Sequence, residues 1–192
     1  MKYQKFLVLI SIIAFTHPGF AQTKYEQEIR IRQIEVPKKA GDFVDGMQLT
    51  RKIKWYKEIG HLRTSFEAKT KYKGKRLSIE FSGNGNFEDL EVEIHTNEIP
   101  PDTYKNISEY LSGTLGKYVI EKIQIQYRGD PKSIRRYTQH LGSDGDLIIH
   151  YEVEVAAKMD GSFVKFEYLF NEDGAFVKQS RIIQKVTDNI VY

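Results

Sequence analysis

The chain has 192 residues, of which 40% are hydrophobic and 12% aromatic, a composition that supports a folded core and excludes a fully disordered chain. Its formal net charge of +3, which falls to about +1 without Lys2 and Lys5, is too small for a dedicated nucleic-acid binder. The absence of cysteine excludes disulfides, zinc–thiolate sites and thiol nucleophiles.

Residues 1–21 have the three parts of a secretory signal peptide. Two lysines precede an apolar run from Phe6 to Phe15, and Gly19 and Ala21 occupy the small-residue positions of a cleavage site. The apolar run is about half of the roughly 20 residues that a membrane-spanning helix needs, which disfavours an uncleaved anchor. We therefore expect cleavage near Ala21, a periplasmic or secreted mature chain, and no transmembrane segment in that chain.

Two alternating segments that each end at a proline organise the mature sequence. Residues 28–36 precede Pro37, and residues 91–99 precede Pro100, 63 positions further along. Proline suits the first turn of a helix, where no amide hydrogen is needed, and apolar residues at helical spacing follow both prolines. Each expected helix is followed by an alternating strand and then by a hairpin with a glycine turn.

The order strand, helix, strand, hairpin, strand occurs twice, and this order predicts an α+β fold of two repeated units. In each unit a short helix packs on one face of an antiparallel sheet. The expected boundaries are 1–21 for the signal peptide, 25–94 for the first repeat, 91–183 for the second repeat and 184–192 for a C-terminal tail. The second unit is longer, and we expect its extra residues in an exposed loop within 128–146.

Strand alternation predicts two antiparallel sheets, or one continuous sheet, with one apolar and one polar face. We expect the helices to cover the apolar face and the polar face to be solvated. The residues expected in the core are Ile29, Ile31, Ile53, Trp55, Phe66, Ala68, Leu77, Ile79, Phe81, Val92, Ile94, Ile123, Ile125, Tyr151, Val153, Val155, Phe166, Tyr168 and Phe170.

Several short motifs of the second unit resemble those of a known family, the PepSY-like and β-lactamase-inhibitor-protein-like periplasmic proteins. The motifs are Ile99-Pro100, the strand at 151–155, the Asp160-Gly161 turn and the segment 170–174. The first unit matches more loosely, at Val36-Pro37, Gly74 and 81–85. The resemblance covers residues 25–183. It implies a small α+β tandem repeat in the cell envelope that binds or inhibits proteins or whose role is unknown, and it implies no catalytic residue.

No pattern in the sequence identifies a catalytic, cofactor or metal site. The histidines are scattered, and neither a nucleophile elbow nor a phosphate-binding glycine loop occurs. Residues 143–146 and 171–174 lack the spacing of a calcium loop and fit turns. Glu152 and Glu154 share a strand face, where paired carboxylates could serve acid–base chemistry, but charged residues are usual on an exposed strand face. We therefore expect no enzyme, no cofactor and no metal ligands.

A run of ten Lys or Arg residues lies between Arg51 and Arg76, with aromatic residues among them. Alternation places part of this run on the polar sheet face, where Tyr56 would anchor a partner and the lysines would form a rim. The candidate partner-binding residues are Lys54, Tyr56, Lys69, Lys71 and Lys73. We expect another envelope protein or an acidic ligand as the partner, and no nucleic acid; a solvated face without a ligand is the alternative.

These patterns together favour a non-enzymatic binding or inhibitory module of the cell envelope, with a partner that the sequence does not identify. Two alternatives stay open: an envelope hydrolase with an unrecognised carboxylate site, and a structural or sensory envelope protein. A deep pocket with converging ionisable groups would favour the hydrolase, whereas a flat or shallow polar face would favour the binding module.

Overall fold

The computed structural model describes residues 22–60, 63–140 and 147–184, so the expected signal peptide and almost all of the expected tail lie outside the described residues. Within these ranges the chain forms nine strands, three α-helices and two short 3-10 helices. The strands are β1 (Gln22–Ile31), β2 (Lys54–Ile59), β3 (Thr64–Tyr72), β4 (Lys75–Ser82), β5 (Phe87–Ile94), β6 (Tyr118–Arg128), β7 (Ile148–Met159), β8 (Ser162–Asn171) and β9 (Phe176–Gln184). The helices are α1 (Lys38–Asp45), α2 (Pro101–Thr114), α3 (Pro131–His140) and the 3-10 helices η1 (Gln33–Glu35) and η2 (Thr96–Glu98). No helix in the described ranges has the length and hydrophobicity needed to cross a membrane.

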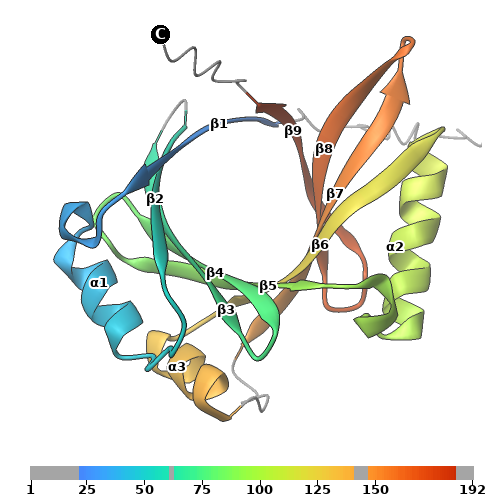
Figure 1. Cartoon of the computed structure of the whole chain (residues 1–192). Helices are drawn as coiled ribbons and strands as arrows, with labels where there is room; N and C mark the ends of the chain where they lie inside the picture. The colour runs from blue at the N-terminus through green and yellow to red at the C-terminus, as the bar shows by residue number, and fades with distance from the viewer. Residues whose placement is uncertain (1–21, 61–62, 141–146, 185–192) are drawn as a thin grey trace, which may run out of the picture.

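The nine strands form one closed sheet. Each strand pairs antiparallel with the next one along the chain, from β1 through β9. The ring is completed by a parallel pairing between β1 and β9, in which Gln22 lies opposite Ser180. Figure 1 shows the ring from one end, with α1 and α3 outside it on one side and α2 outside it on the other.

The expected fold of two repeated helix-plus-sheet units is wrong, because the described strands belong to a single closed sheet. Strand β5, which the expected units 25–94 and 91–183 share, pairs with β4 on one side and β6 on the other. The sheet therefore passes from the first half of the chain into the second without a boundary. Alternation defines the two faces of each strand, but it does not specify the long-range partners that remove exposed strand edges by closing the sheet.

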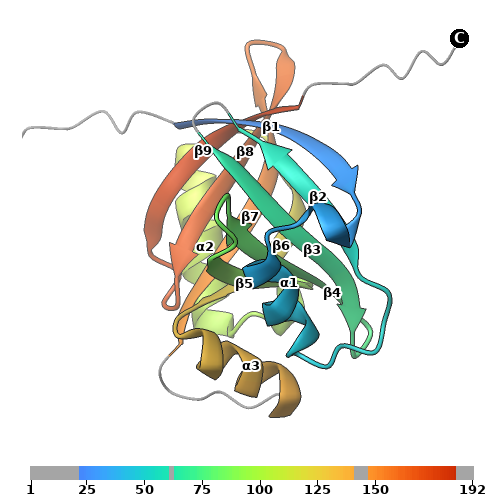
Figure 2. The ribbon, with the colours of Figure 1, turned by 90° about the vertical axis from the view of Figure 1, so that its left-hand side faces the viewer.

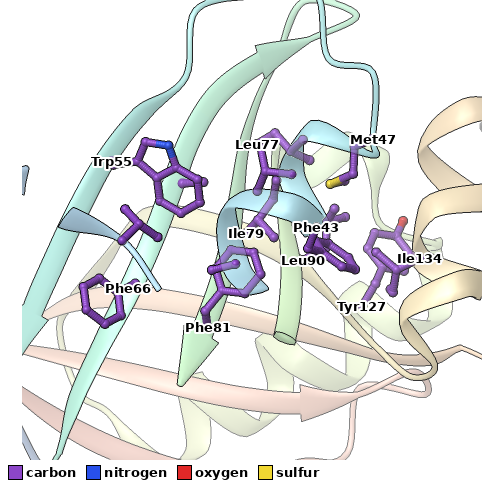
Figure 3. Packing of buried hydrophobic residues seen from close by; sticks show 14 residues of the cluster. Phe43, Met47, Trp55, Phe66, Leu77, Ile79, Phe81, Leu90, Tyr127 and Ile134 are labelled. Atoms are coloured by element: carbon purple, nitrogen blue, oxygen red, sulfur yellow. The ribbon is translucent and has the colours of Figure 1, made fainter. Parts of the chain in front are cut away.

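The outer face of the sheet carries the hydrophobic core. One cluster lies under α1 and α3, where Phe81 is fully buried and its ring centre lies 5.6 Å from that of Phe43. Figure 3 shows this cluster, with aromatic and aliphatic side chains from several strands meeting α1. A second cluster lies under α2, where Ile107 and Leu111 pack on strands β6 to β8 around Tyr168. Burying each large apolar side chain contributes about 1.5–3 kcal/mol, so this face supplies most of the stability.

Within the segment 128–146, where the sequence predicts an exposed loop, residues 131–140 form α3, and residues 141–146 lie outside the described residues. Pro131 occupies the first turn of α3, and the Asp130 carboxylate accepts hydrogen bonds from the backbone N–H groups of Lys132 (2.9 Å) and Ser133 (3.2 Å). Ile134 is completely buried in the first cluster. The polar composition of this segment concealed a helix with one apolar side, which lies beside α1 in Figure 2.

Two glycine turns fix where α1 and α2 begin on the sheet. Gly85 (φ +75°) lies so close to α1 that a Cβ atom there would be 2.7 Å from the Cβ of Pro37. Gly174 (φ +81°) lies equally close to α2, and its Cβ would be 2.5 Å from the carbonyl oxygen of Thr103. Both positions therefore require glycine, for backbone conformation and for space.

Candidate functional site

The inner face of the closed sheet is lined by polar side chains. The residues that alternate with the core residues point inward, so Tyr56, Glu67, Glu80 and Asp89 follow one another in register across β2, β3, β4 and β5. Tyr56, Glu67 and Glu80 border a cavity of about 730 Å³. The carboxylates of its lining are Glu58, Glu67, Glu80, Glu91, Glu93, Glu152, Glu154 and Glu167, and its cationic residues are Arg51, Lys52, Lys54, Lys69, Lys71, Arg76 and Lys122.

The expectation that the polar face is solvated is wrong for its centre. Glu67, Glu91, Glu152 and Glu167 are each only 4–6% exposed. Closure of the sheet turns a face that would be open in a flat sheet toward the middle of the molecule. Glu152 therefore belongs to a buried group of carboxylates and not to an exposed strand face. The signal in the sequence was the recurrence of Glu at inward positions of many strands. Each strand alone indicates only a charged face, and closure of the sheet brings these carboxylates together.

Two lysines provide positive charge among these carboxylates. The Nζ atom of Lys69 lies 2.9 Å from a Glu67 oxygen and 2.5 Å from a Glu28 oxygen, and Lys122 pairs with Glu154. Burial alone would lower the pKa of both lysines. The neighbouring charges, of Glu67 at Lys69 and of Glu154 at Lys122, outweigh burial and raise each pKa above its usual value. Both lysines are therefore protonated at neutral pH.

A group of cationic side chains lines one end of the cavity, where β3 turns into β4. Lys71 and Arg76 are paired in register there, both are exposed, and Lys54 lies nearby on β2, in register with Lys69. Arg76 also contacts Glu93 at 3.3 Å. The cavity thus has a basic end, which we call the basic rim (Arg51, Lys52, Lys54, Lys71 and Arg76), and an acidic centre.

Four of the five predicted partner-binding residues line this cavity, namely Lys54, Tyr56, Lys69 and Lys71. The Nζ atom of Lys69 lies 5.0 Å from the centre of the Tyr56 ring, within the range of a cation–π contact. Lys73 lies apart from them. It occupies the turn after β3 with φ 46°, is exposed, and does not line the cavity. The strand ends at Tyr72, so the alternation that would place Lys73 inward ends there.

Two groups of three carboxylates have ligand atoms that all lie within 4.8 Å of one another, although the sequence predicted no metal ligands. The first group is Glu28, Glu58 and Glu67, and the second is Glu80, Asp89 and Glu91. In the first group Lys69 contacts both Glu28 and Glu67, and the Ser65 hydroxyl donates to Glu58 at 3.0 Å. In the second group the Gln124 side-chain amide donates to Glu91 at 2.8 Å.

No known family and no curated protein matches the sequence. Among solved structures, the chain is similar to a DUF2874 family protein from Bacteroides ovatus, with 14% identity, a TM-score of 0.50, and coverage of 76% of this chain and 87% of that one. A protein from Bacteroides eggerthii that is provisionally named periplasmic has 12% identity and a TM-score of 0.49. That match covers 76% of this chain and 88% of the other. A BLIP-like protein from Bacteroides fragilis has 16% identity and a TM-score of 0.45, over 82% of this chain and 92% of the other. At such low identity the first similarity shows a shared fold alone, and the other two are too distant to carry an argument.

Proposed function

We propose that this protein is a non-enzymatic binding or inhibitory module of the cell envelope, of the PepSY-like and BLIP-like type, and that its partner binds at the inner face of the closed sheet. The observation that carries the proposal is the charged cavity of about 730 Å³ inside the sheet. The signal-peptide pattern of residues 1–21 supports export to the periplasm, with cleavage near Ala21.

The chemistry of the cavity favours a charged partner over an apolar small molecule. Pockets for small ligands are predominantly apolar with a few polar groups, whereas most residues that line this cavity are ionisable. The basic rim would attract an acidic segment, and Tyr56 offers the amphipathic ring that is common at the centre of protein interfaces. An acidic segment of another envelope protein fits these features best.

Two exposed apolar side chains extend the same inward-facing surface onto β6 and β8. Val119 is 57% exposed and lies opposite Ala156, which shares the inner face of β7 with Glu154. Phe163 is 59% exposed and lies on the same face of β8 as Lys165. A partner that placed its acidic segment at the rim and an apolar group on Phe163 would use the inner face in both halves of the sheet.

Affinity capture from an envelope fraction tests the proposal with three versions of the full chain. Wild type should retain a partner that is released by salt, because rim charges are screened. Tyr56→Ala should fold normally and bind about 1–2 kcal/mol more weakly, as expected for an interface anchor. The control is Ile34→Ala, which changes an 84% exposed residue of η1 and should bind as wild type does. Equal retention by all three versions would remove the inner face from the binding site.

An envelope hydrolase is the second candidate, because ionisable groups do converge in a cavity. Two features make it the weaker one. The described lining contains no histidine, and its two central lysines are held in their charged form by carboxylates and cannot act as nucleophiles or bases. Turnover of an envelope polymer that is lost in Glu152→Gln, but retained in Ile34→Ala, would support the hydrolase over the binding module.

A further inference from the structure

The second carboxylate group lies on two neighbouring strands of the inner face. Glu80 on β4 is opposite Asp89 on β5, and Glu91 is the next inward residue along β5. Asp89 and Glu91 are 6% and 5% exposed. One oxygen of each of the three carboxylates lies within 4.8 Å of the others, so a single ion of calcium size can contact all three.

Two glutamine side chains on β6 add a second, independent observation. Gln124 donates its Nε2 hydrogen to Glu91, and Gln126 lies directly opposite Glu91 in the β5–β6 register. Both side chains are more than nine-tenths buried, at 6% and 7% exposed. Within the described part of the chain, neither Oε1 atom accepts a hydrogen bond. Buried amide oxygens normally have a partner, and leaving one without a partner costs about 1–3 kcal/mol.

We propose that Glu80, Asp89 and Glu91, together with the amide oxygens of Gln124 and Gln126, form a binding site for one calcium ion. Calcium prefers six to eight oxygen ligands, including carboxylates and glutamine carbonyls, in a flexible arrangement at about 2.3–2.6 Å. These five residues supply that type of ligand from three adjacent strands. Glu80, Glu91 and Gln124 also line the cavity, from which water can reach the remaining positions. A cation here gives the two amide oxygens the partner that they otherwise lack.

The alternative is a site that holds shared protons in place of a metal ion. Carboxyl groups this close can be bridged by protons, since like charges at short range raise the pKa of one member. Lys122 contributes some positive charge near Glu91 but pairs directly with Glu154. The two possibilities differ in one measurable respect: only the metal site responds to calcium at constant pH. The proposal does not depend on the partner-binding function, which is measured separately.

Calorimetric titration tests the proposal on the full chain after treatment with a chelator. Calcium chloride at pH 7 should bind wild type with one site per chain and a dissociation constant of about 1 mM or lower, the weak limit of protein calcium sites. Glu91→Gln should weaken binding about 100-fold or more, since loss of an outer partner alone typically costs about 10–100-fold. Gln126→Met, which removes an amide oxygen at similar volume, should weaken it at least several-fold. The control is Glu88→Gln, which lies beside Asp89, pairs with Arg63 outside the cavity, and should bind calcium as wild type does.

The thermal unfolding midpoint provides a second readout that stays informative if a variant folds poorly. Calcium should raise the midpoint of wild type and Glu88→Gln, and should leave that of Glu91→Gln unchanged. Absence of calcium binding to wild type would overturn the proposal and favour shared protons. Calcium binding that is equal in wild type, Glu91→Gln and Gln126→Met would overturn it as well, because the ion would then lie elsewhere.

Discussion

The two faces of the closed sheet both bury side chains, but they do so with opposite chemistry. On β8, the neighbouring residues Glu167 and Tyr168 are 6% and 0% exposed. Tyr168 lies on the outer face among aromatic rings under α2, whereas Glu167 lines the charged cavity inside the ring. Burial alone therefore does not identify the core of this protein. The outer face provides stability, and the inner face provides a charged surface that only a closed sheet can bury.

The comparison predicts that apolar residues of the outer face are the most costly to truncate. Phe81→Ala removes a fully buried ring that packs against Phe43, Trp55 and Phe87. We expect the free energy of unfolding to fall by about 3–5 kcal/mol, the usual cost of such a cavity. Denaturant unfolding measures this loss from the midpoint, with an unchanged slope. A loss below about 1 kcal/mol would contradict the assignment of stability to the outer face.

On the inner face, a substitution should lower the free energy of unfolding mainly when it leaves a charged side chain without its partner. Lys122→Met leaves Glu154 without its cation. Because the Lys122 side chain is 36% exposed, we expect a loss of about 1–2 kcal/mol, below the about 3–5 kcal/mol of a fully buried pair. The double variant Lys122→Met, Glu154→Leu should recover most of this loss. If the loss in the double variant equals the sum of the losses in the two single variants, Lys122 and Glu154 are not energetically coupled, which would contradict this account.

A smaller effect, of opposite sign, is expected at Tyr168. Its hydroxyl group is buried and makes no hydrogen bond to any described residue. Tyr168→Phe removes this group and keeps the ring, so the free energy of unfolding should rise by up to about 1 kcal/mol. Thermal or denaturant unfolding at pH 7 measures the change. A decrease would indicate that the hydroxyl has a stabilising partner, such as a buried water molecule.

The same buried hydroxyl group should also make stability depend on alkaline pH. Burial, with a contribution from Tyr110, raises the pKa of Tyr168 to about 12, above its usual value of 10.0. The unfolded chain therefore loses this proton at lower pH than the folded protein does. Stability that is fully present below pH 10 should decline between pH 10 and 12. Tyr168→Phe should show a shallower decline than wild type, whereas parallel curves would contradict the raised pKa.

Local patterns in the sequence predicted much of the outer face. Trp55, Ile79 and Val153 were expected in the core from alternation, and all are buried. The same rule placed Ile29 in the core, yet it is 40% exposed. The prolines before α1 and α2 and the glycines in the turns beneath these helices were visible because their constraints are local.

The long-range features could not be predicted in this way. The pairing of β1 with β9 joins residues more than 150 positions apart and leaves no local signal. Without that closure the inner residues form an exposed polar face, so Glu67 and Glu152 were not recognised as buried. The candidate site was therefore found in part: Tyr56 and Lys69 were identified, and the surrounding carboxylates and their glutamine neighbours were not.

Thiol labelling tests the central claim that the inner face lines an accessible cavity while the outer face is a sealed core. The chain has no cysteine, so each introduced thiol is the only one present. Ser78→Cys places a thiol on the cavity lining, and Ala68→Cys places one in the outer core, where the residue is 0% exposed. In the folded protein, Ser78→Cys should react rapidly with a small charged thiol reagent, and Ala68→Cys should react only after unfolding. Protection of the Ser78→Cys thiol to the same degree as the Ala68→Cys thiol would contradict the account.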